Sequence, residues 1–416
     1  MTSETKQPAS GDVDDIHLYE TLLQNVIRKN YSNNNLKVKV VKVQDVVPVG
    51  DNYLSCLLRL FIEVSSDDMP LQKNSFILKI FPKGEMMKKF IEEDGIFRKE
   101  ITMYKEILPK INRIAASILN GETFVAEFFD TGEDHLLVME DLKIGGYKMA
   151  NRQVGLDTDH CKIAIKALAR FHCISMAMTE DDPSLFDMLP EAKELKERVR
   201  DMNKMCFDLY EELSQVVESW PGFERFGSKL REVRLTVAEN VERCKDRNNT
   251  AIAVLNHGDF WPNNMLFKYS EDTGRVESIK FVDFQMSHFG SPAADLHYFL
   301  VSSPSAQIRA DGTDALVEEY HSEFCRVSDL LGCKTRLSLE WLKEEMKNKL
   351  FYALHVSCFL LHLFVAERED APDFSQLTEE DLTKGQKSVF MKSFNGAKFK
   401  AILQKLLLKF EKEGLL

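Results

Sequence analysis

The 416-residue sequence has no excess of basic residues, no paired cysteine motif and no long apolar run. Its 54 Lys and Arg stand against 66 Asp and Glu, a formal net charge of −12 at pH 7. A negative field repels phosphate groups, which argues against a general nucleic-acid or anionic-membrane binder but allows a local basic pocket. Hydrophobic residues make up 44% of the chain, so it can bury a large core and is not disordered as a whole.

The eight cysteines form no C-x-x-C pair and follow no regular spacing. This pattern argues against a zinc ribbon or a disulfide framework and predicts reduced thiols in a cytoplasmic protein. Residues 1–15 are polar, contain no apolar signal core and are predicted to form a disordered tail. The most apolar stretch, Phe351 to Ala366, is too short to span a bilayer, so we expect a buried helix there.

The N-terminal third of the chain has the pattern of a sheet. After a helix near residues 18–27, residues 36–81 alternate β-branched and polar residues between turn-forming segments, which predicts an antiparallel meander. A helix then runs from Phe90 and is expected to stop near Pro109. The expected strands lie at residues 38–40, 53–64, 76–81, 123–129 and 135–140.

Beyond Gly145 the pattern is helical, apart from a short β interruption at residues 251–283. The order of elements predicts an α+β, bilobal fold. Residues 16–141 would form a β-rich N-lobe with a five-stranded sheet, and residues 142–416 a helix-rich C-lobe with the catalytic loop and the acceptor pocket. Further helices are expected at residues 158–178, 191–218 and 226–246.

The β interruption carries residues that suit phosphoryl transfer. Asp259 lies five residues before Asn264, and Asp283 follows nineteen residues after Asn264, at the end of an apolar run. Two strands joined by a turn at residues 271–274 would bring the three to one edge. Asp283 and the amide oxygen of Asn264 are hard ligands that suit Mg²⁺, and Asp259 could accept the proton of a substrate hydroxyl. The competing interpretation is a loop of solvated acids and amides.

The N-terminal lobe is expected to supply the other supports of a nucleotide. Lys79 lies in mid-strand between Leu78 and Ile80, where an ammonium group is costly unless it is paired. Glu100 lies 21 residues further on, on the following helix, and is the expected partner. Such a pair would hold the lysine against the α- and β-phosphates. The alternative is an exposed strand lysine and a surface glutamate.

Two further segments could contact the nucleotide through their backbone. The segment that contains Gly50, Asn52 and Ser55 could cover the phosphates, because its glycine allows a close approach. The backbone at Met139 and Asp141 could meet the edge of an adenine. Each signal is weak alone, since one glycine in a hairpin is ordinarily only a turn.

The chain resembles the ecdysteroid kinase-like family, on the aminoglycoside phosphotransferase and choline kinase side of the protein-kinase-like superfamily. The likeness spans about residues 40–365. Its most specific part is the motif His257-Gly258-Asp259-Phe260-Trp261 with Asn263 and Asn264. The other stretches that carry it lie at residues 50–55, 97–109 and 283–296.

The resemblance implies a role for each matched residue. Asp259 would be the catalytic base, Asn264 and Asp283 would hold Mg²⁺, and Lys79 and Glu100 would anchor the phosphates. His257 and Asp295 would brace the loop rather than take part in the chemistry.

The departures from protein kinases favour a small substrate. Gly258 stands where protein kinases carry the arginine that receives a phosphorylated activation loop. Only eleven residues separate Asp283 from Asp295, which leaves no room for a loop that displays a peptide. Gln285 replaces the usual glycine of Asp-Phe-Gly, which argues against a flipping switch.

These features predict an ATP- and Mg²⁺-dependent kinase that phosphorylates an alcohol of a small molecule. The resemblance implies a steroid-like or other apolar acceptor, and no nucleic acid, membrane or obligate protein partner is expected. Two alternatives stay open, a choline- or aminoglycoside-type kinase with a polar cationic substrate and a non-catalytic nucleotide-binding pseudokinase. Phe260 and Trp261 could line the acceptor pocket or only pack the loop. His172 is expected to be a hydrogen-bonded core residue.

Overall fold

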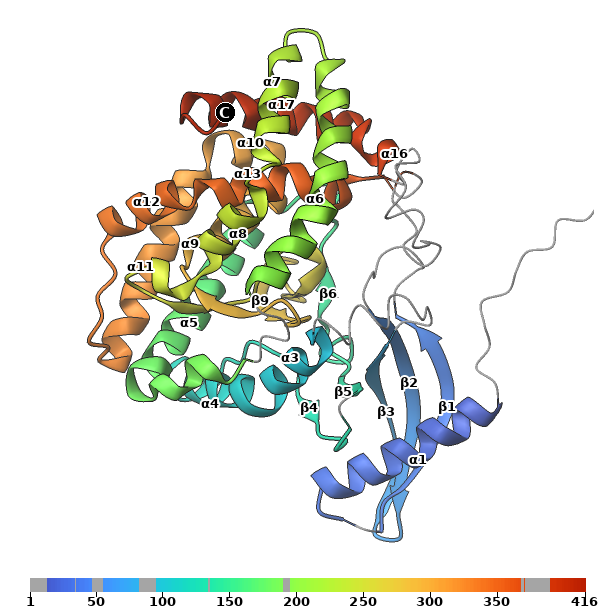
Figure 1. Cartoon of the computed structure of the whole chain (residues 1–416). Coiled ribbons are helices and arrows are strands. Elements are labelled where there is room, and N and C mark those ends of the chain that lie inside the picture. The colour runs from blue at the N-terminus through green and yellow to red at the C-terminus, as the bar shows by residue number, and fades with distance from the viewer. Residues whose placement is uncertain are drawn as a thin grey trace, which may run out of the picture. The chain divides into compact units, whose positions relative to one another are not determined.

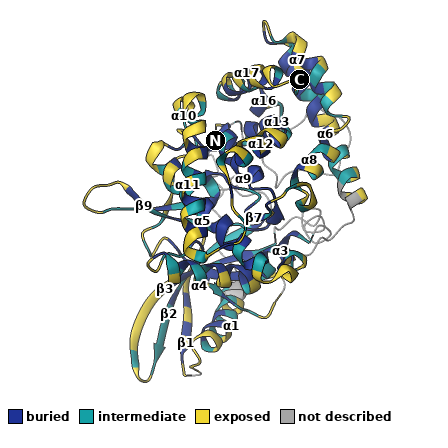
Figure 2. Cartoon of the chain, turned by 90° about the vertical axis from the view of Figure 1, so that its left-hand side faces the viewer, coloured by how far each residue is buried: buried dark blue, intermediate teal, exposed yellow. Residues whose placement is uncertain are grey.

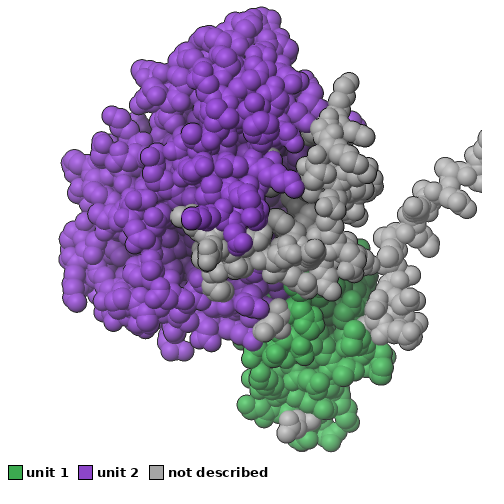
Figure 3. Space-filling model, in the orientation of Figure 1, with its two compact units in different colours: residues 1–89, 126–145 green, residues 90–125, 146–416 purple. Residues whose placement is uncertain are grey.

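The computed structural model describes residues 13–33, 35–46, 55–81, 95–133, 135–189, 195–367, 370 and 390–416. It divides into two compact units, Met1–Lys89 with Ala126–Gly145, and Phe90–Val125 with Gly146–Leu416 (Figure 3). The first unit is rich in strands and the second in helices, so the predicted α+β class is confirmed (Figure 1).

Five strands of the described chain form the antiparallel sheet of the first unit, in the order β1-β2-β3-β5-β4. Apolar residues alternate along these strands, so one face can be buried. Leu23, Val26 and Ile27 of α1 follow helical spacing and pack into the same core as Leu60 and Leu78 of the sheet. The elements are α1 (Val13–Asn30), β1 (Lys37–Asp45), β2 (Cys56–Ser66), β3 (Met69–Ile80), β4 (Phe128–Phe129) and β5 (Leu136–Glu140).

Several boundaries in this region differ from the predictions. β1 extends to Asp45 rather than ending at residue 40, and β3 begins at Met69 rather than at residue 76, because the polar residues before Phe76 also pair with β2. The strand expected at residues 123–129 is reduced to Phe128–Phe129, because Val125 bridges instead to Phe281 within the second unit. The predicted tail lies outside the described residues up to residue 12, and α1 begins at Val13.

The second unit begins with a continuous helical segment and ends with a helical bundle. Its N-terminal and middle elements are α3 (Ile96–Thr102), the π-helix η1 (Met103–Ile107), α4 (Leu108–Ile118), β6 (Lys148–Met149), α5 (Thr158–Asp181), η2 (Pro183–Asp187), α6 (Leu195–Glu218), α7 (Glu224–Val233), α8 (Val237–Lys245), η3 (Arg247–Asn249), β7 (Val254–Asn256), η4 (Pro262–Asn264), β8 (Met265–Tyr269), β9 (Val276–Phe281) and β10 (His288–Gly290). The elements that follow are α9 (Ala293–Ser302), α10 (Ala306–Asp311), α11 (Thr313–Leu331), α12 (Leu339–Asn348), α13 (Leu350–Phe359), α14 (Leu361–Val365), α16 (Met391–Phe394) and α17 (Ala397–Lys412).

The structure groups the helix that carries Glu100 with the second unit. The lobes proposed at residues 16–141 and 142–416 therefore stay a prediction. The sequence predicted that this helix would stop near Pro109, but it continues to Ile118. A π-helical turn precedes α4, and Pro109 falls in the first turn of α4, where a missing N–H leaves no hydrogen bond unmade.

Two predicted helices are each divided. The helix expected at residues 226–246 is α7 and α8, which Arg234–Thr236 separate. The apolar stretch expected as one helix is α13 and α14, divided at Leu360. The stretch is buried as expected, because His355 and His362 lie in the core.

The core of the second unit surrounds α9 and β7, where Figure 2 shows buried residues in dark blue. The turn of the β8–β9 hairpin projects from this core and is exposed, yellow in the same view. All eight cysteines lie in the described residues and carry free thiols.

Candidate functional site

Strand pairing brings the predicted catalytic segment together. β8 and β9 form the expected hairpin, in which Met265 pairs with Phe281. Beyond this pair the N–H of Val282 donates to the carbonyl of Asn264 at 3.1 Å. Asn264, at the start of the hairpin, therefore lies beside the residue that precedes Asp283. β7 pairs with β10 and delivers the loop that begins at His257.

The carboxylate of Asp259 receives three side-chain hydrogen bonds. Oδ2 accepts from Nδ2 of Asn264 at 2.7 Å and from the indole N–H of Trp261 at 3.2 Å. Oδ1 accepts from the hydroxyl of Tyr298 on α9. Asn264 also donates to the backbone carbonyl of Asp259 at 2.9 Å. The predicted neighbours Asp259 and Asn264 are thus in direct contact.

Burial and, to a smaller extent, the charge of Asp283 raise the pKa of Asp259 to about 6. The three donors lower it but do not cancel the effect of burial. At neutral pH the carboxyl group of Asp259 is therefore mainly ionised. A pKa this close to the working pH suits general acid–base catalysis.

Asp283 adopts a positive φ of 68°, a conformation that only a few non-glycine residues adopt. Its charge affects both Asp259 and Tyr104, so it lies in the same neighbourhood as the candidate base. Glu100 also raises the pKa of Tyr104, and the Tyr104 ring meets Phe284 edge-on at 5.8 Å. Tyr104 therefore connects the surroundings of Glu100 with those of Asp283.

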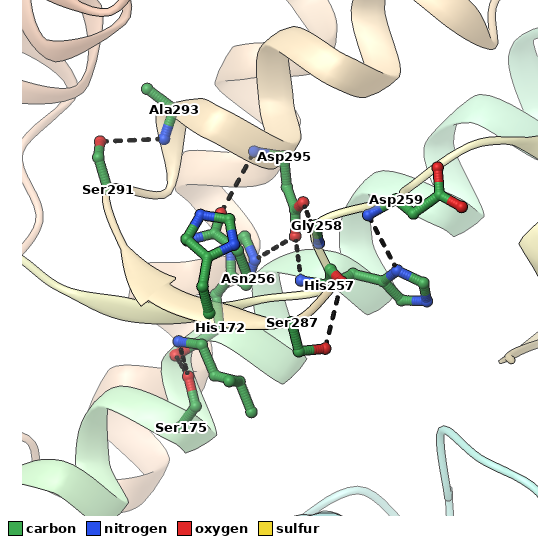
Figure 4. Close-up of polar contacts among 12 residues, drawn as sticks. His172, Ser175, Asn256, His257, Gly258, Asp259, Ser287, Ser291, Ala293 and Asp295 are labelled. Atoms are coloured by element: carbon green, nitrogen blue, oxygen red, sulfur yellow. Dashed lines mark hydrogen bonds and ion pairs between the residues drawn. The ribbon is translucent and has the colours of Figure 1, made fainter. Parts of the chain in front are cut away.

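Asp295 holds the backbone that leads to Asp259 (Figure 4). Its carboxylate accepts the N–H of His257 at 2.6 Å and the N–H of Gly258 at 2.9 Å. The ring of His257 donates from Nε2 to the carbonyl of Val282 at 3.1 Å, so Nδ1 can accept the N–H of Asp259 at 3.4 Å. The predicted bracing by His257 and Asp295 is confirmed by these contacts.

His172 completes this buried network. Its Nε2 lies 3.1 Å from Oδ2 of Asp295, and its Nδ1 lies 2.8 Å from the hydroxyl of Tyr320. Burial alone would raise the pKa of Asp295, but the hydrogen bond and charge of His172, together with the charge of His257 and the Gly258 N–H, lower it. His172 is a hydrogen-bonded core residue, as predicted.

Gly258 is required at its position. Its φ is +83°, and a Cβ built there would lie 2.1 Å from the carbonyl oxygen of Met286. The loop therefore passes so close to the turn that follows Asp283 that no side chain fits between them.

Phe260 and Trp261 pack within the unit. Phe260 is fully buried and meets Phe281 edge-on at 5.0 Å. Trp261 stacks on Phe364 at 4.4 Å and belongs to the large hydrophobic core of the helical bundle. The loop-packing interpretation therefore holds for both. Trp261 in addition donates a hydrogen bond from its indole N–H to Asp259.

Lys79 and Glu100 are both buried, with exposed fractions of 2% and 0%. Lys79 lies in β3 between Leu57 of β2 and Leu137 of β5, so the alternative of an exposed strand lysine is wrong. Glu100 is likewise no surface residue. The two belong to different units, and their pairing stays a prediction.

Of the remaining predicted nucleotide contacts, Gly50 and Asn52 lie outside the described residues. Ser55 is buried just before β2. Met139 pairs with Ile77 on one side and with Phe128 on the other, inside the sheet.

The side chain of Asp141 accepts from Arg59 at 2.7 Å and from the hydroxyl of Ser75 at 2.6 Å, while its carbonyl accepts the N–H of Ile144 at 2.9 Å. Asp141 therefore ties β2 and β3 to the end of β5. Its contact with an adenine is untested.

Tyr298 is the site residue that the sequence analysis missed. Its signal was available, because it lies three residues after Asp295 on one helix, and residues at that spacing share a helix face.

Within the described residues, no group of three or more His, Cys, Asp or Glu could hold a metal ion. A site of Asn264 and Asp283 offers two oxygen ligands, which suits Mg²⁺ because this ion takes its other ligands from phosphates and water. Nδ2 of Asn264 is turned toward Asp259, so Oδ1 is the atom that Asn264 would offer to a cation.

The chain belongs to the ecdysteroid kinase-like family, whose model matches residues 49–333, more than half of the chain. The predicted family, kinase-like fold and phosphotransferase class are thereby confirmed, and a kinase-like enzyme implies ATP as the phosphoryl donor.

Solved structures with some likeness include a glucosamine kinase in complex with glucosamine, ADP and inorganic phosphate. It is 14% identical, with a TM-score of 0.36, over 86% of this chain and 82% of that chain. The aminoglycoside phosphotransferase APH(4)-Ia is 10% identical, with a TM-score of 0.30, over 80% of this chain and 98% of that chain. Because both TM-scores lie below 0.5, we assign neither fold nor function from them.

No curated protein matches the chain. Among the helices of the described residues, none is both long and apolar enough to cross a membrane.

Proposed function

We propose that the chain is an ATP-dependent small-molecule kinase that transfers the γ-phosphoryl group to an alcohol hydroxyl of an ecdysteroid or another apolar hydroxylated compound. Membership of the family supports the first part of this proposal, that the chain is a small-molecule kinase. The observation that supports the chemistry is the carboxylate of Asp259, which three donors fix in place and whose pKa burial raises to about 6.

Asp259 would act as the base. An ionised carboxylate has about four acceptor positions. Two donors occupy Oδ2 and one occupies Oδ1, so Oδ1 keeps a position for the acceptor hydroxyl. The hydroxyl would donate its proton there while its oxygen attacks the γ-phosphorus, and the bond from that phosphorus to the β–γ bridging oxygen breaks to release ADP.

Asn264 and Asp283 would hold Mg²⁺. When bound, the ion would neutralise charge on the phosphates. Two observations support this assignment: Asn264 donates to Asp259, which orients its amide, and β8 and β9 pair so that their ends bring Asn264 and Asp283 close together. Lys79, with Glu100 as its partner, would anchor the phosphates, and Gly50, Asn52, Ser55, Met139 and Asp141 would complete the nucleotide site.

The acceptor would lie on the aromatic side of the base. Trp261 stacks on Phe364, and the next two residues, Val365 and Ala366, line a cavity of about 190 Å³ together with Phe399. Such a volume admits only part of a steroid-sized molecule. The same cavity is also lined by Glu367, Asp370, Ser393 and Lys398, so its wall is about as polar as it is apolar. The choice of an apolar acceptor therefore rests on the family alone.

The test is product formation with a panel of acceptors. Wild-type protein is incubated with Mg-ATP and ecdysone, choline or kanamycin, and the phosphorylated product is identified by mass spectrometry alongside ADP release. Product from ecdysone supports the proposal, whereas product only from choline or kanamycin favours a kinase of cationic substrates. Stabilisation by Mg-ATP without any product across a wide panel favours a pseudokinase.

The matched variants are Asp259→Asn and Asp272→Asn. Asp272 is an exposed acid in the β8–β9 turn. Loss of turnover in the first variant alone assigns the base to Asp259, and equal turnover in both would reject the mechanism.

A further inference from the structure

One face of α9 meets the catalytic loop at two separate points. Asp295 and Tyr298 are three residues apart on this helix and therefore project to the same side. Asp295 accepts the backbone N–H groups of His257 and Gly258, and Tyr298 donates to the side chain of Asp259. The helix thus fixes both the path of the loop and the orientation of its carboxylate.

Tyr298 is itself rigidly placed. It is 3% exposed, and its ring lies 5.7 Å from that of Phe364, which also stacks on Trp261. The carbonyl of Tyr298 accepts the hydroxyl of Ser302 at 2.8 Å within α9. α9 packs against α12, α13 and α14, so it is held on several sides. A tyrosine in such a setting loses little further freedom when it makes a hydrogen bond.

The two carboxylate oxygens of Asp259 accept different numbers of side-chain hydrogen bonds. Asn264 and Trp261 both donate to Oδ2, whereas Tyr298 donates to Oδ1. Removal of the Trp261 N–H would leave Oδ2 with its shorter hydrogen bond. Removal of the Tyr298 hydroxyl would leave Oδ1 without its donor. This donor also fixes the direction in which the remaining acceptor position of Oδ1 points.

We propose that Tyr298 is the positioning residue of the base: its hydroxyl holds Asp259 so that Oδ1 receives the proton of the acceptor hydroxyl. This inference rests on the proposed function and adds to it the side of the carboxylate at which the acceptor reacts. Tyr298 does not contact the substrate in this scheme but acts through Asp259.

A simpler interpretation is that Tyr298 only satisfies a buried hydroxyl. Two other buried tyrosines of the unit do this with histidines, since Tyr320 meets His172 at 2.8 Å and Tyr210 meets His355 at 3.4 Å. The two interpretations differ in what Tyr298→Phe changes. A structural role predicts lower stability and altered substrate affinity, whereas positioning predicts a loss confined to kcat.

The experiment compares Tyr298→Phe with Tyr352→Phe and Trp261→Phe under saturating Mg-ATP and acceptor. Tyr352 is buried in the same hydrophobic core and lies near Asp259 but is not one of its three side-chain donors, so its variant is the matched control. We expect Tyr298→Phe to lose kcat by about tenfold or more, because a hydrogen bond to a charged group is removed. KM for ATP should stay at the wild-type value, and the variant should remain folded at the assay temperature. Trp261→Phe should lose less kcat than Tyr298→Phe.

Three results would overturn the inference. They are wild-type kcat in Tyr298→Phe, an equal loss in Trp261→Phe, and a Tyr298→Phe protein that unfolds or loses affinity for both substrates. Each of these leaves the kinase activity of the wild-type protein intact. Absence of product from the wild-type protein with every acceptor would instead overturn the proposed function, and this inference with it.

Discussion

The candidate catalytic loop of the second unit, residues 257–264, and the sheet of the first unit hold their candidate residues in different ways. In the loop, Asp259, His257 and Asp295 are held by hydrogen bonds of their own side chains. In the sheet, Lys79 and Met139 are held by the backbone register of β3 and β5. A side-chain change in the loop therefore alters structure and chemistry together, whereas a change in the sheet can remove a side chain and leave its support in place.

The largest expected effect is the loss of the base. Asp259→Asn should lower kcat by about 10²–10⁴-fold, the usual contribution of a general base. Binding of Mg-ATP should persist, because the proposed phosphate contacts lie elsewhere. Product formation measures the first effect and thermal stabilisation by Mg-ATP the second. Loss of both together would mean that the loop cannot tolerate the change, and would weaken the assignment of Asp259 as a base.

Lys79→Met should weaken the binding of Mg-ATP, whereas Asp259→Asn should leave this binding in place. The backbone of β3 keeps its partners, so the fold should survive, while the anchor of the phosphates is lost. A charge-assisted hydrogen bond contributes about 1.5–3 kcal/mol, so affinity for Mg-ATP should fall by roughly tenfold or more. Calorimetric titration with Mg-ATP measures this change. Lys73→Met is the matched control, because Lys73 lies on the exposed part of the same strand. Unchanged affinity in Lys79→Met would remove Lys79 from the site.

Glycine gives a sharper comparison within the second unit. Gly258→Ala and Gly274→Ala both place a side chain at positive φ, which costs about 1–2 kcal/mol. Only at Gly258 does the new Cβ meet backbone, and such overpacking adds about 1–3 kcal/mol. Urea unfolding should therefore show a larger loss of stability for Gly258→Ala, together with a loss of kcat. Equal losses in the two variants would mean that the loop can move away from Met286.

Much of this arrangement could be predicted from sequence because it is local. Alternating strands indicated the sheet, and the spacing of Asp259, Asn264 and Asp283 around a hairpin indicated their convergence. The division at Leu360 and the path of the helix through Pro109 were not predictable in the same way. Both depend on how the surrounding residues pack around one turn of the helix. The apolar pattern of the sequence does not change at such a turn.

Distant side chains account for what was missed at the site. The role of Tyr298 as a donor to Asp259 depends on where α9 lies against the loop, and residue type alone does not show this. Trp261 lies two residues after Asp259, so its role as a donor depends on the conformation of the loop itself. Spacing does place Tyr298 on the face of Asp295, so the residue could have been considered. The predicted pairing of Lys79 with Glu100 would join residues of separate units, and neither spacing nor the packing of one unit decides it.

The last expected effect is a difference in pH dependence. Burial raises the pKa of Asp259 to about 6, so kcat should rise with pH through this value as the base ionises. The effect on stability has the opposite sign. A carboxyl group whose pKa is higher in the folded state, here above an ordinary value of about 3.9, stabilises the fold below that ordinary value and loses the contribution as pH rises to about 6. Asp259→Asn cannot ionise and should escape this loss.

Urea unfolding at pH 4, 5, 6 and 7 measures the difference between wild type and Asp259→Asn, in which the titration of other groups cancels. The variant should gain stability relative to wild type over this range, most of it before pH 7. Parallel curves would show that the pKa of Asp259 is the same in the folded and unfolded chain. The loop would then hold its central carboxylate as loosely as a solvated surface acid, and its difference from the sheet would lie in geometry alone.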